Sequence, residues 1–233
     1  PFFSLEKKGA QPEKHIIIPN LEYMEKLIGI SNGKIKMVSI APELKGALPI
    51  ISYLKSNNVV VAMAHSNATY EEAKKGIYEG ISVATHLFNG MRSFSHREPG
   101  IVGAALTDER VYCELIYDTI HLHDISVEIA MKMKGIEKIV LVSDAMRAAG
   151  IKDGEYELGG QRVFVRKGVA KLENGTLAGS TLNLRKAVHN MVSRMNLPIH
   201  KAVSMASINP AKAINIDDRK GSLEVGKDAD VII

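Results

Sequence analysis

Cysteine is almost absent from this sequence, and its scarcity narrows the class of protein. Cys113 is the only cysteine among 233 residues and lies in an apolar stretch. The chain therefore cannot form an internal disulfide, and we interpret Cys113 as a buried thiol of a cytoplasmic protein. No apolar run approaches the length of a membrane span, and no signal peptide is recognisable. The sequence indicates neither a disulfide scaffold nor a membrane protein.

Blocks of positive charge are also missing. The net charge of +4 comes from dispersed residues, and no Lys/Arg run is longer than two. This pattern does not indicate a nucleic-acid surface, but it fits a mild preference for an anionic small molecule. The apolar fraction of 45% and the charged fraction of 24% are ordinary for a globular protein. The length suits one α/β barrel or two smaller domains.

Two short apolar runs that end on histidine organise the chain. Residues 59–64 lead directly into His65, and residues 81–85 lead into His86. The segment between them, 70–79, has the pattern of a helix. The pattern predicts two parallel strands joined by a helix, so both imidazoles would lie at one edge of a sheet.

The other predicted elements continue this alternation. Thr69 and Glu72 form a capping box for helix 70–79, and Ser126 is expected to contribute to the cap of helix 124–134. Residues 87–100 are expected to form a polar loop, and residues 155–165 a β-hairpin around a Gly-Gly turn. Further strands are predicted at 36–40, 111–117 and 138–143, and further helices at 21–30, 44–56, 182–195, 199–206 and from residue 209.

Polar and ionisable side chains follow all five predicted strands. They are Glu43, His65, His86, Asp118 with His121, and Asp144. Such groups at strand C-termini, alternating with helices, are typical of the active face of a (β/α) barrel. We therefore predict the α/β class, with a (β/α)8 TIM-like barrel that is incomplete in this chain and carries a β-hairpin insert.

His65, His86 and Asp144 predict a metal site. A single histidine at a strand end is more often structural, but two on consecutive strands with a later carboxylate favour a site. Neutral imidazole binds zinc or iron, and the carboxylate would act as a general base. Asp144 could instead cap a helix. Glu43 could be a third ligand, although we favour a structural carboxylate there.

Candidate substrate contacts lie on the loops that follow the strands. His121 could be a surface residue or a donor to a substrate carbonyl or hydroxyl. Arg97 could be a solvated charge, or a phosphate ligand through its planar fork, with Asn89 and Gly90 contacting the same ligand.

These motifs, in this order, resemble the N-acetylglucosamine-6-phosphate deacetylases of the amidohydrolase superfamily. The resemblance runs along the whole chain, and many motifs with family-like spacing make it specific. The matching segments are residues 8–12, 41–43, 65–70, 84–91, 96–100, 118–121, 144–146, 177–180 and 209–211.

The resemblance implies a hydrolase of amino-sugar metabolism that works with a divalent metal, with zinc as the expected ion and iron or another divalent ion as an alternative. It implies His65 and His86 as metal ligands, Asp144 as general base and acid, and His121 as a catalytic donor. It further implies a phosphosugar substrate, a homodimer and, for Arg97, a contact to the neighbouring subunit's site. The implied substrate-binding residues are Ala10, Gln11, Asn89, Gly90, Arg97, Asp118, Thr119, Ile120, His121, Leu177, Ala178 and Gly179.

This chain also departs from the family pattern. The family's metal-binding glutamate belongs to a His-Leu-Glu-Gly-Pro-Phe motif whose end matches Pro1 and Phe2, so that glutamate is expected before Pro1. Thr119 stands where the family usually has glycine. We expect residues 1–220 to form a partial hydrolase barrel, and residues 221–233 to begin a strand that returns to a small β-domain.

Two other functions remain open. One is an amidohydrolase for a different N-acyl sugar or a cyclic amide, which turnover without a substrate phosphate would support. The other is a non-catalytic phosphosugar-binding protein, which tight binding without metal would support.

A polypeptide that starts at Pro1 is expected to bind metal weakly and to turn over poorly, because only two of the three implied ligands are present. Acetate release and zinc binding, compared with those of a polypeptide carrying the full motif, test this. Full activity from Pro1 onward would contradict it.

Overall fold

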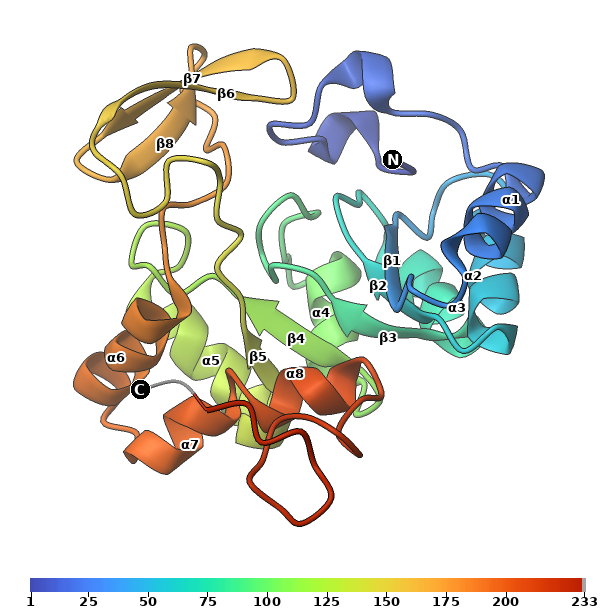
Figure 1. Cartoon of the computed structure of the whole chain (residues 1–233). Coiled ribbons are helices and arrows are strands. Elements are labelled where there is room, and N and C mark those ends of the chain that lie inside the picture. Colours follow the sequence, from blue (N-terminus) through green and yellow to red (C-terminus); the bar gives the residue numbers. More distant parts are fainter. Residues whose placement is uncertain (232–233) are drawn as a thin grey trace.

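Five parallel strands form the centre of the molecule (Figure 1). The computed structural model describes residues 1–231, and the strands pair in chain order. Isolated parallel bridges join Phe2 to Ile40 and Ala145 to Ser180, so pairing continues beyond both edges. The α/β class is confirmed, and residues 1–231 form part of a barrel wall. The strands are β1 (Met37–Ile40), β2 (Val60–Met63), β3 (Ile81–Ala84), β4 (Tyr112–Leu115) and β5 (Ile139–Leu141).

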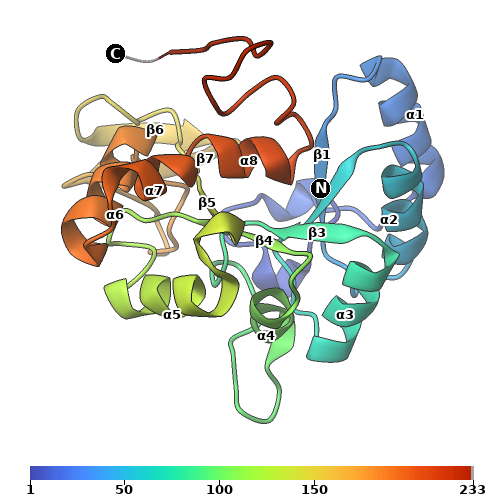
Figure 2. The same cartoon turned by 90° about the horizontal axis from the view of Figure 1, so that it is seen from below.

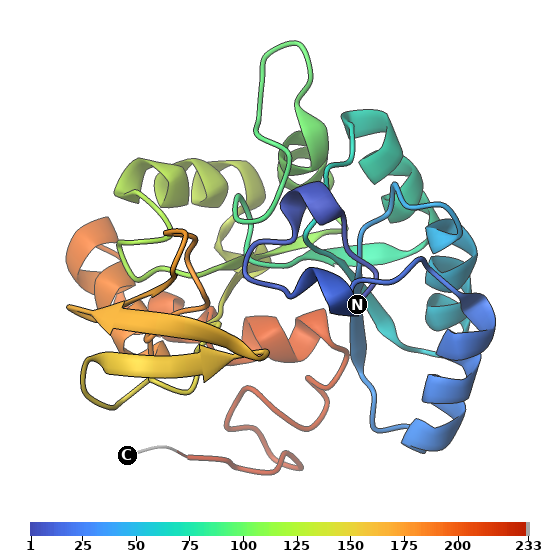
Figure 3. The same cartoon turned by 90° about the horizontal axis from the view of Figure 1, so that it is seen from above.

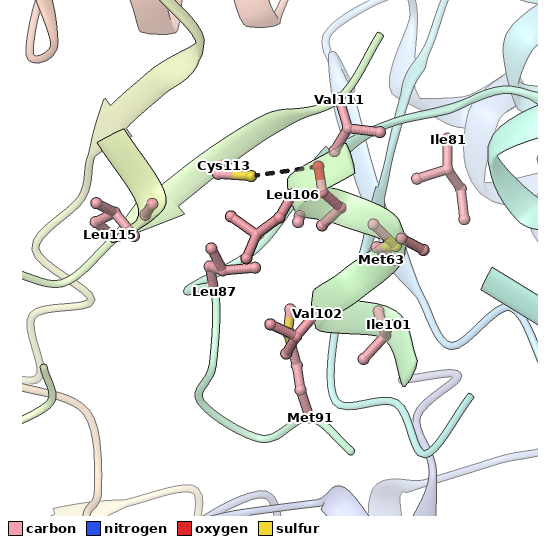
Figure 4. Packing of buried hydrophobic residues seen from close by; sticks show 14 of the residues in the cluster. Met63, Ile81, Leu87, Met91, Ile101, Val102, Leu106, Val111, Cys113 and Leu115 are labelled. Atoms are coloured by element: carbon pink, nitrogen blue, oxygen red, sulfur yellow. Dashed lines mark hydrogen bonds between the residues drawn. The ribbon is translucent and has the colours of Figure 1, made fainter. Parts of the chain in front are cut away.

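Helices cover the outer face of this wall (Figure 2). They are α1 (Leu21–Ser31), α2 (Ala47–Ser56), α3 (Tyr70–Glu79), α4 (Gly100–Thr107) and α5 (Asp124–Lys134). The main core lies between these helices and the strands (Figure 4). Cys113 is fully buried there, its Sγ 3.9 Å from the Ala105 carbonyl oxygen, and burial raises its pKa to about 12. The prediction of a buried thiol is confirmed.

Alternate strand residues face the other way, toward the inside of the barrel wall. Val60, Ala62, Val83 and Val140 form a separate inner cluster with Ala213. Ala213 belongs to the last of three C-terminal helices, which follow the strands: α6 (Leu184–Met195), α7 (Ile199–Ser204) and α8 (Ile208–Ala213).

Local capping explains where the helices begin. The predicted capping box of α3 is confirmed, since Thr69 and Glu72 each accept from the other's backbone N–H. The prediction for Ser126 is wrong, because the cap of α5 is His123, whose Nδ1 accepts from the Ile125 N–H at 3.2 Å. Helix α2 begins at residue 47 instead of 44, because Gly46 adopts φ +88° and interrupts a helical path.

One α-helix and one strand were not predicted. Helix α4 begins at the end of the loop expected at 87–100 and continues through residues for which no element was predicted. Its residues from Gly100 to Leu106 are all small or apolar and all buried, so it has no polar face. Without a polar face, periodicity gives no signal. Strand β8 (Val169–Leu172) extends the predicted hairpin, β6 (Gly154–Leu158) and β7 (Gln161–Arg166), into a three-stranded antiparallel sheet.

The antiparallel sheet and the N-terminal segment lie together above the parallel strands (Figure 3). Gln161 Nε2 donates to the Ala10 carbonyl at 2.7 Å. The turn at Gly159 approaches Pro12 so closely that an added Cβ would lie 2.9 Å from the Pro12 Cγ. These contacts hold the antiparallel sheet against the N-terminal segment.

The C-terminal part of the chain differs from expectation. Residues 221–231 form no strand, and the last two residues of the expected return strand lie outside the described residues. Its assignment to a second domain stays a prediction. Within residues 1–231, no helix combines the length and the apolar character that crossing a membrane requires.

Replacement of Gly159 by alanine is expected to lower the melting temperature more than replacement of Gly160. Both glycines have positive φ, +60° and +82°, so both variants carry the left-handed cost of about 1–2 kcal/mol. Only the Cβ at 159 meets another residue; at 160 nothing lies within 4 Å. Thermal unfolding of Gly159→Ala and Gly160→Ala checks this, and equal losses would contradict the proposed docking of the turn on Pro12.

Candidate active site

The ends of β2 to β5 meet around one cavity, as the order of the polar groups predicts. This cavity has a volume of about 390 Å³, and His65, His86, His121 and Asp144 all line it. Each of these residues follows a different strand. Parallel alignment therefore brings side chains up to 79 positions apart, His65 to Asp144, into one site.

The two imidazoles point at each other. Their Nε2 atoms are 3.2 Å apart, and the rings are inclined at 78°. His65 Nδ1 lies 2.8 Å from the Lys7 carbonyl oxygen. Because a carbonyl only accepts, Nδ1 carries the hydrogen, and Nε2 of the neutral ring offers a lone pair. A metal-binding histidine usually has such a carbonyl partner on its other nitrogen.

Burial keeps this pair uncharged. It lowers the pKa of His65 to about 4, with a further contribution from His86, and it also lowers the pKa of His86. Burial raises the pKa of Asp144, while His121 and His65 act in the opposite direction. Neutral imidazole is the form that ligates a metal, so the pair is in the right state for one.

The three residues after the strands share an unusual backbone conformation. His65, His86 and Asp144 have φ values of +46°, +37° and +47°. Left-handed φ in non-glycine residues is uncommon and is concentrated at functional sites. The conformation turns the chain sharply at each strand end, where these side chains line the cavity.

Glu43 supports the turn that follows His65. Its Oε2 accepts from the Ser66 hydroxyl at 2.8 Å, and its Oε1 accepts from the Asn67 N–H at 2.6 Å. Both oxygens are thus occupied, which supports the structural interpretation of this carboxylate over the ligand interpretation.

The donor set fits a divalent metal but is not complete in these residues. Two convergent nitrogens suit zinc or iron. Within residues 1–231, no group of three or more His, Cys, Asp or Glu side chains is arranged to hold a metal ion. The described part of the chain therefore offers two imidazole ligands, beside the Asp144 carboxylate that lines the same cavity.

Asp118 holds His121 rather than lining the cavity. Its Oδ2 lies 2.7 Å from His121 Nδ1, and its Oδ1 accepts from the N–H groups of Ile120 and His121, both at 2.8 Å. Although burial opposes it, the hydrogen bonds from His121 and Ile120 lower the pKa of Asp118. Thr119, where glycine was expected, takes a left-handed φ of +69°. Thr119 and Ile120 are exposed and lie outside the cavity.

The predicted substrate contacts divide into two groups. Those that line the cavity are Ala10, Gln11, Asn89, Gly90, Leu177 and Gly179. Arg97 is exposed on the loop before α4, and Ala178 is buried in the core beneath the antiparallel sheet; neither lines the cavity. Their roles stay predictions.

Several lining residues were missed. The hairpin turn contributes Leu158 and Gly159. The other lining residues that were missed are Gly9, Pro12, Ile116, Ala145, Met146 and Thr176. The turn itself was predicted, but the sequence carries no signal for where it docks. Glu114 was also missed: it is 8% exposed on β4, and burial raises its pKa to about 7.

The chain is similar to known proteins along its full length. A model of the amidohydrolase family matches residues 10–233. The chain is 42% identical over 233 residues to an N-acetylglucosamine-6-phosphate deacetylase of Lysinibacillus sphaericus, and 40% identical over 232 residues to an N-acetylgalactosamine-6-phosphate deacetylase of Escherichia coli O157:H7. These matches cover all of this chain but only 60% and 61% of the relatives' lengths.

Solved structures give the same result. The N-acetylglucosamine-6-phosphate deacetylase of Pasteurella multocida superposes with a TM-score of 0.92 at 35% identity, over 97% of this chain and 59% of that one. A mutant of the Mycobacterium smegmatis enzyme, in complex with N-acetyl-D-glucosamine-6-phosphate, gives 0.93 at 35% identity, over 98% and 61%. By sequence and by fold, this chain belongs to the amidohydrolase family.

Proposed function

We propose that this chain is the catalytic part of an enzyme that removes the acetyl group from N-acetylglucosamine 6-phosphate, with the help of a divalent metal. The observation that carries the proposal is the convergence of His65 Nε2 and His86 Nε2 in the cavity that Asp144 also lines. The similarity to deacetylases named for this substrate supports the choice of reaction.

His65 and His86 would hold the metal, with zinc as the proposed ion and a third ligand from the motif that the family places before Pro1. When bound there, a divalent metal polarises an amide carbonyl and lowers the pKa of water. The Lys7 carbonyl keeps the His65 ring in the tautomer that this role requires.

Asp144 and His121 would move protons and orient the amide. The Asp144 carboxylate accepts the proton of the attacking water and then delivers it to the departing sugar amine, so the same group serves as base and acid. His121 directs its free Nε2 at the substrate because Asp118 engages its Nδ1. An N–H at that position would donate to the acetyl oxygen and stabilise developing negative charge.

The loops above the strands would hold the sugar phosphate. Asn89, Gly90, Ala10 and Gln11 line the wall of the cavity and are proposed to contact it. Arg97, exposed and outside this cavity, is proposed to reach the phosphate in the neighbouring subunit of a homodimer. We assign the enzyme to cytoplasmic amino-sugar breakdown.

A second substrate has specific support. One of the similar relatives acts by name on N-acetylgalactosamine 6-phosphate, and its 40% identity is close to the 42% of the glucosamine enzyme. The two sugars differ only in the orientation of one hydroxyl group, so both belong in every assay.

Replacement of Asp144 by asparagine is expected to reduce acetate release by about 10²–10⁴-fold, because the amide cannot accept or return the proton. The assay measures acetate from both sugar phosphates, with and without a chelator, in a polypeptide carrying the full His-Leu-Glu-Gly-Pro-Phe motif. Asp218→Asn, at an exposed position, is the matched control. Chelator-insensitive turnover, or full activity of Asp144→Asn, would overturn the mechanism.

Replacement of Asp118 by asparagine is expected to switch the neutral tautomer of His121. The amide oxygen would keep the two backbone N–H groups, so its NH₂ would face Nδ1 and force that nitrogen to accept. Side-chain ¹⁵N shifts of histidine measure this without any turnover. His123 is an internal reference, because its Nδ1 already accepts from a backbone N–H. An unchanged His121 tautomer would show that Asp118 does not orient the ring.

A further inference from the structure

Glu114 is a buried carboxylate on the inner face of the barrel wall. Its neighbours Cys113 and Leu115 belong to the outer core, so strand alternation turns Glu114 inward, toward the face that carries Val83 and Val140. Only 8% of the residue is exposed. No step of the proposed reaction uses this residue.

Glu114 lies directly beneath His86. Cys113 pairs with Ala84, and the Glu114 carbonyl accepts from the Leu87 N–H at 2.8 Å, so Glu114 lies alongside residues 85–87. Burial raises the pKa of this carboxyl to about 7. The Thr85 hydroxyl oxygen, on the same stretch, is buried without a hydrogen-bond partner in the described chain. Two buried polar groups, the Glu114 carboxylate and the Thr85 hydroxyl, therefore lie next to His86.

No ion pair in the described part of the chain balances the charge of the Glu114 carboxylate. Within residues 1–231, no Lys, Arg or His forms an ion pair with Glu114. Burying an unpaired carboxylate is costly, and such groups are normally paired or placed near a metal. The two imidazoles at the same end of the strands are themselves neutral and do not balance this charge.

We propose that Glu114 is a positioning residue that strengthens divalent-cation binding at His65 and His86 from beneath, without ligating the ion. Its negative charge, on the inner face beside the stretch that carries His86, complements the charge of the cation. This inference rests on the metal site of the proposed function.

The experiment measures zinc binding and thermal unfolding of a polypeptide that carries the full His-Leu-Glu-Gly-Pro-Phe motif, with zinc alone as the probe. Glu114→Gln removes the negative charge and keeps the size of the side chain. It is expected to weaken zinc binding by about 10–100-fold, as outer partners of metal ligands do. The metal-free melting temperature is expected to stay the same or rise, because the buried charge is gone. Zinc affinity is read by competition with a chromophoric chelator.

Two control variants separate the explanations. Glu109→Gln, at an exposed carboxylate shortly before β4, is expected to bind zinc as the wild type does. His86→Ala is expected to lose binding. Unchanged zinc affinity in Glu114→Gln, with loss in His86→Ala, would overturn the inference and leave the proposed function intact. A fall in the metal-free melting temperature together with affinity would reduce Glu114 to a structural role. A wild type that binds no zinc would overturn the inference and the metal site together.

Discussion

The parallel register of β1 to β5 is the constraint on which the site depends. All five strands run in the same direction, so the residues that follow each strand lie at the same edge of the sheet. After three of these strands one such residue, His65, His86 or Asp144, adopts a left-handed φ, which costs about 1–2 kcal/mol for an L-residue. Local hydrogen bonds offset that cost: Glu43 holds the turn after His65, and the Ser180 N–H donates to the Asp144 carbonyl at 2.8 Å.

The N-terminal segment adds what the strands cannot supply. It brings the Lys7 carbonyl to His65 Nδ1 and places Phe3 against the His65 ring, with 4.7 Å between centroids. Clearance around this ring is limited: a Cβ at Gly90 would lie 2.8 Å from Nδ1. The same segment meets the insert through Ala10 and Pro12. The His65 ring follows β2 in the chain, but contacts with Phe3, Lys7 and Gly90 fix its orientation.

The contrast between predicted and missed features has a physical basis. A short run of apolar, β-branched residues indicates a buried strand, and a helix with a polar face leaves a period in the sequence, which is why β2, α3 and the convergence of His65 with His86 were predictable. Helix α4 is buried all round and leaves no period. The placement of the hairpin turn on Pro12 depends on packing between distant segments, and no local pattern encodes it. The position of Arg97 outside the cavity is likewise a property of the loop path.

Glu114 shows why inner positions are harder to interpret than strand ends. A carboxylate in the middle of an apolar strand looks, in sequence, like an interruption of the pattern or a solvent-facing residue. Only the register shows that it faces inward, beside the stretch that carries His86, where no ion pair within residues 1–231 balances it. Two neutral imidazoles, with the buried Glu114 and with Asp144 nearby, make the cavity a place where a cation lowers the energy of its surroundings and an anion raises it. A cation held by the two imidazoles would therefore also be favoured by a charge that is not one of its ligands.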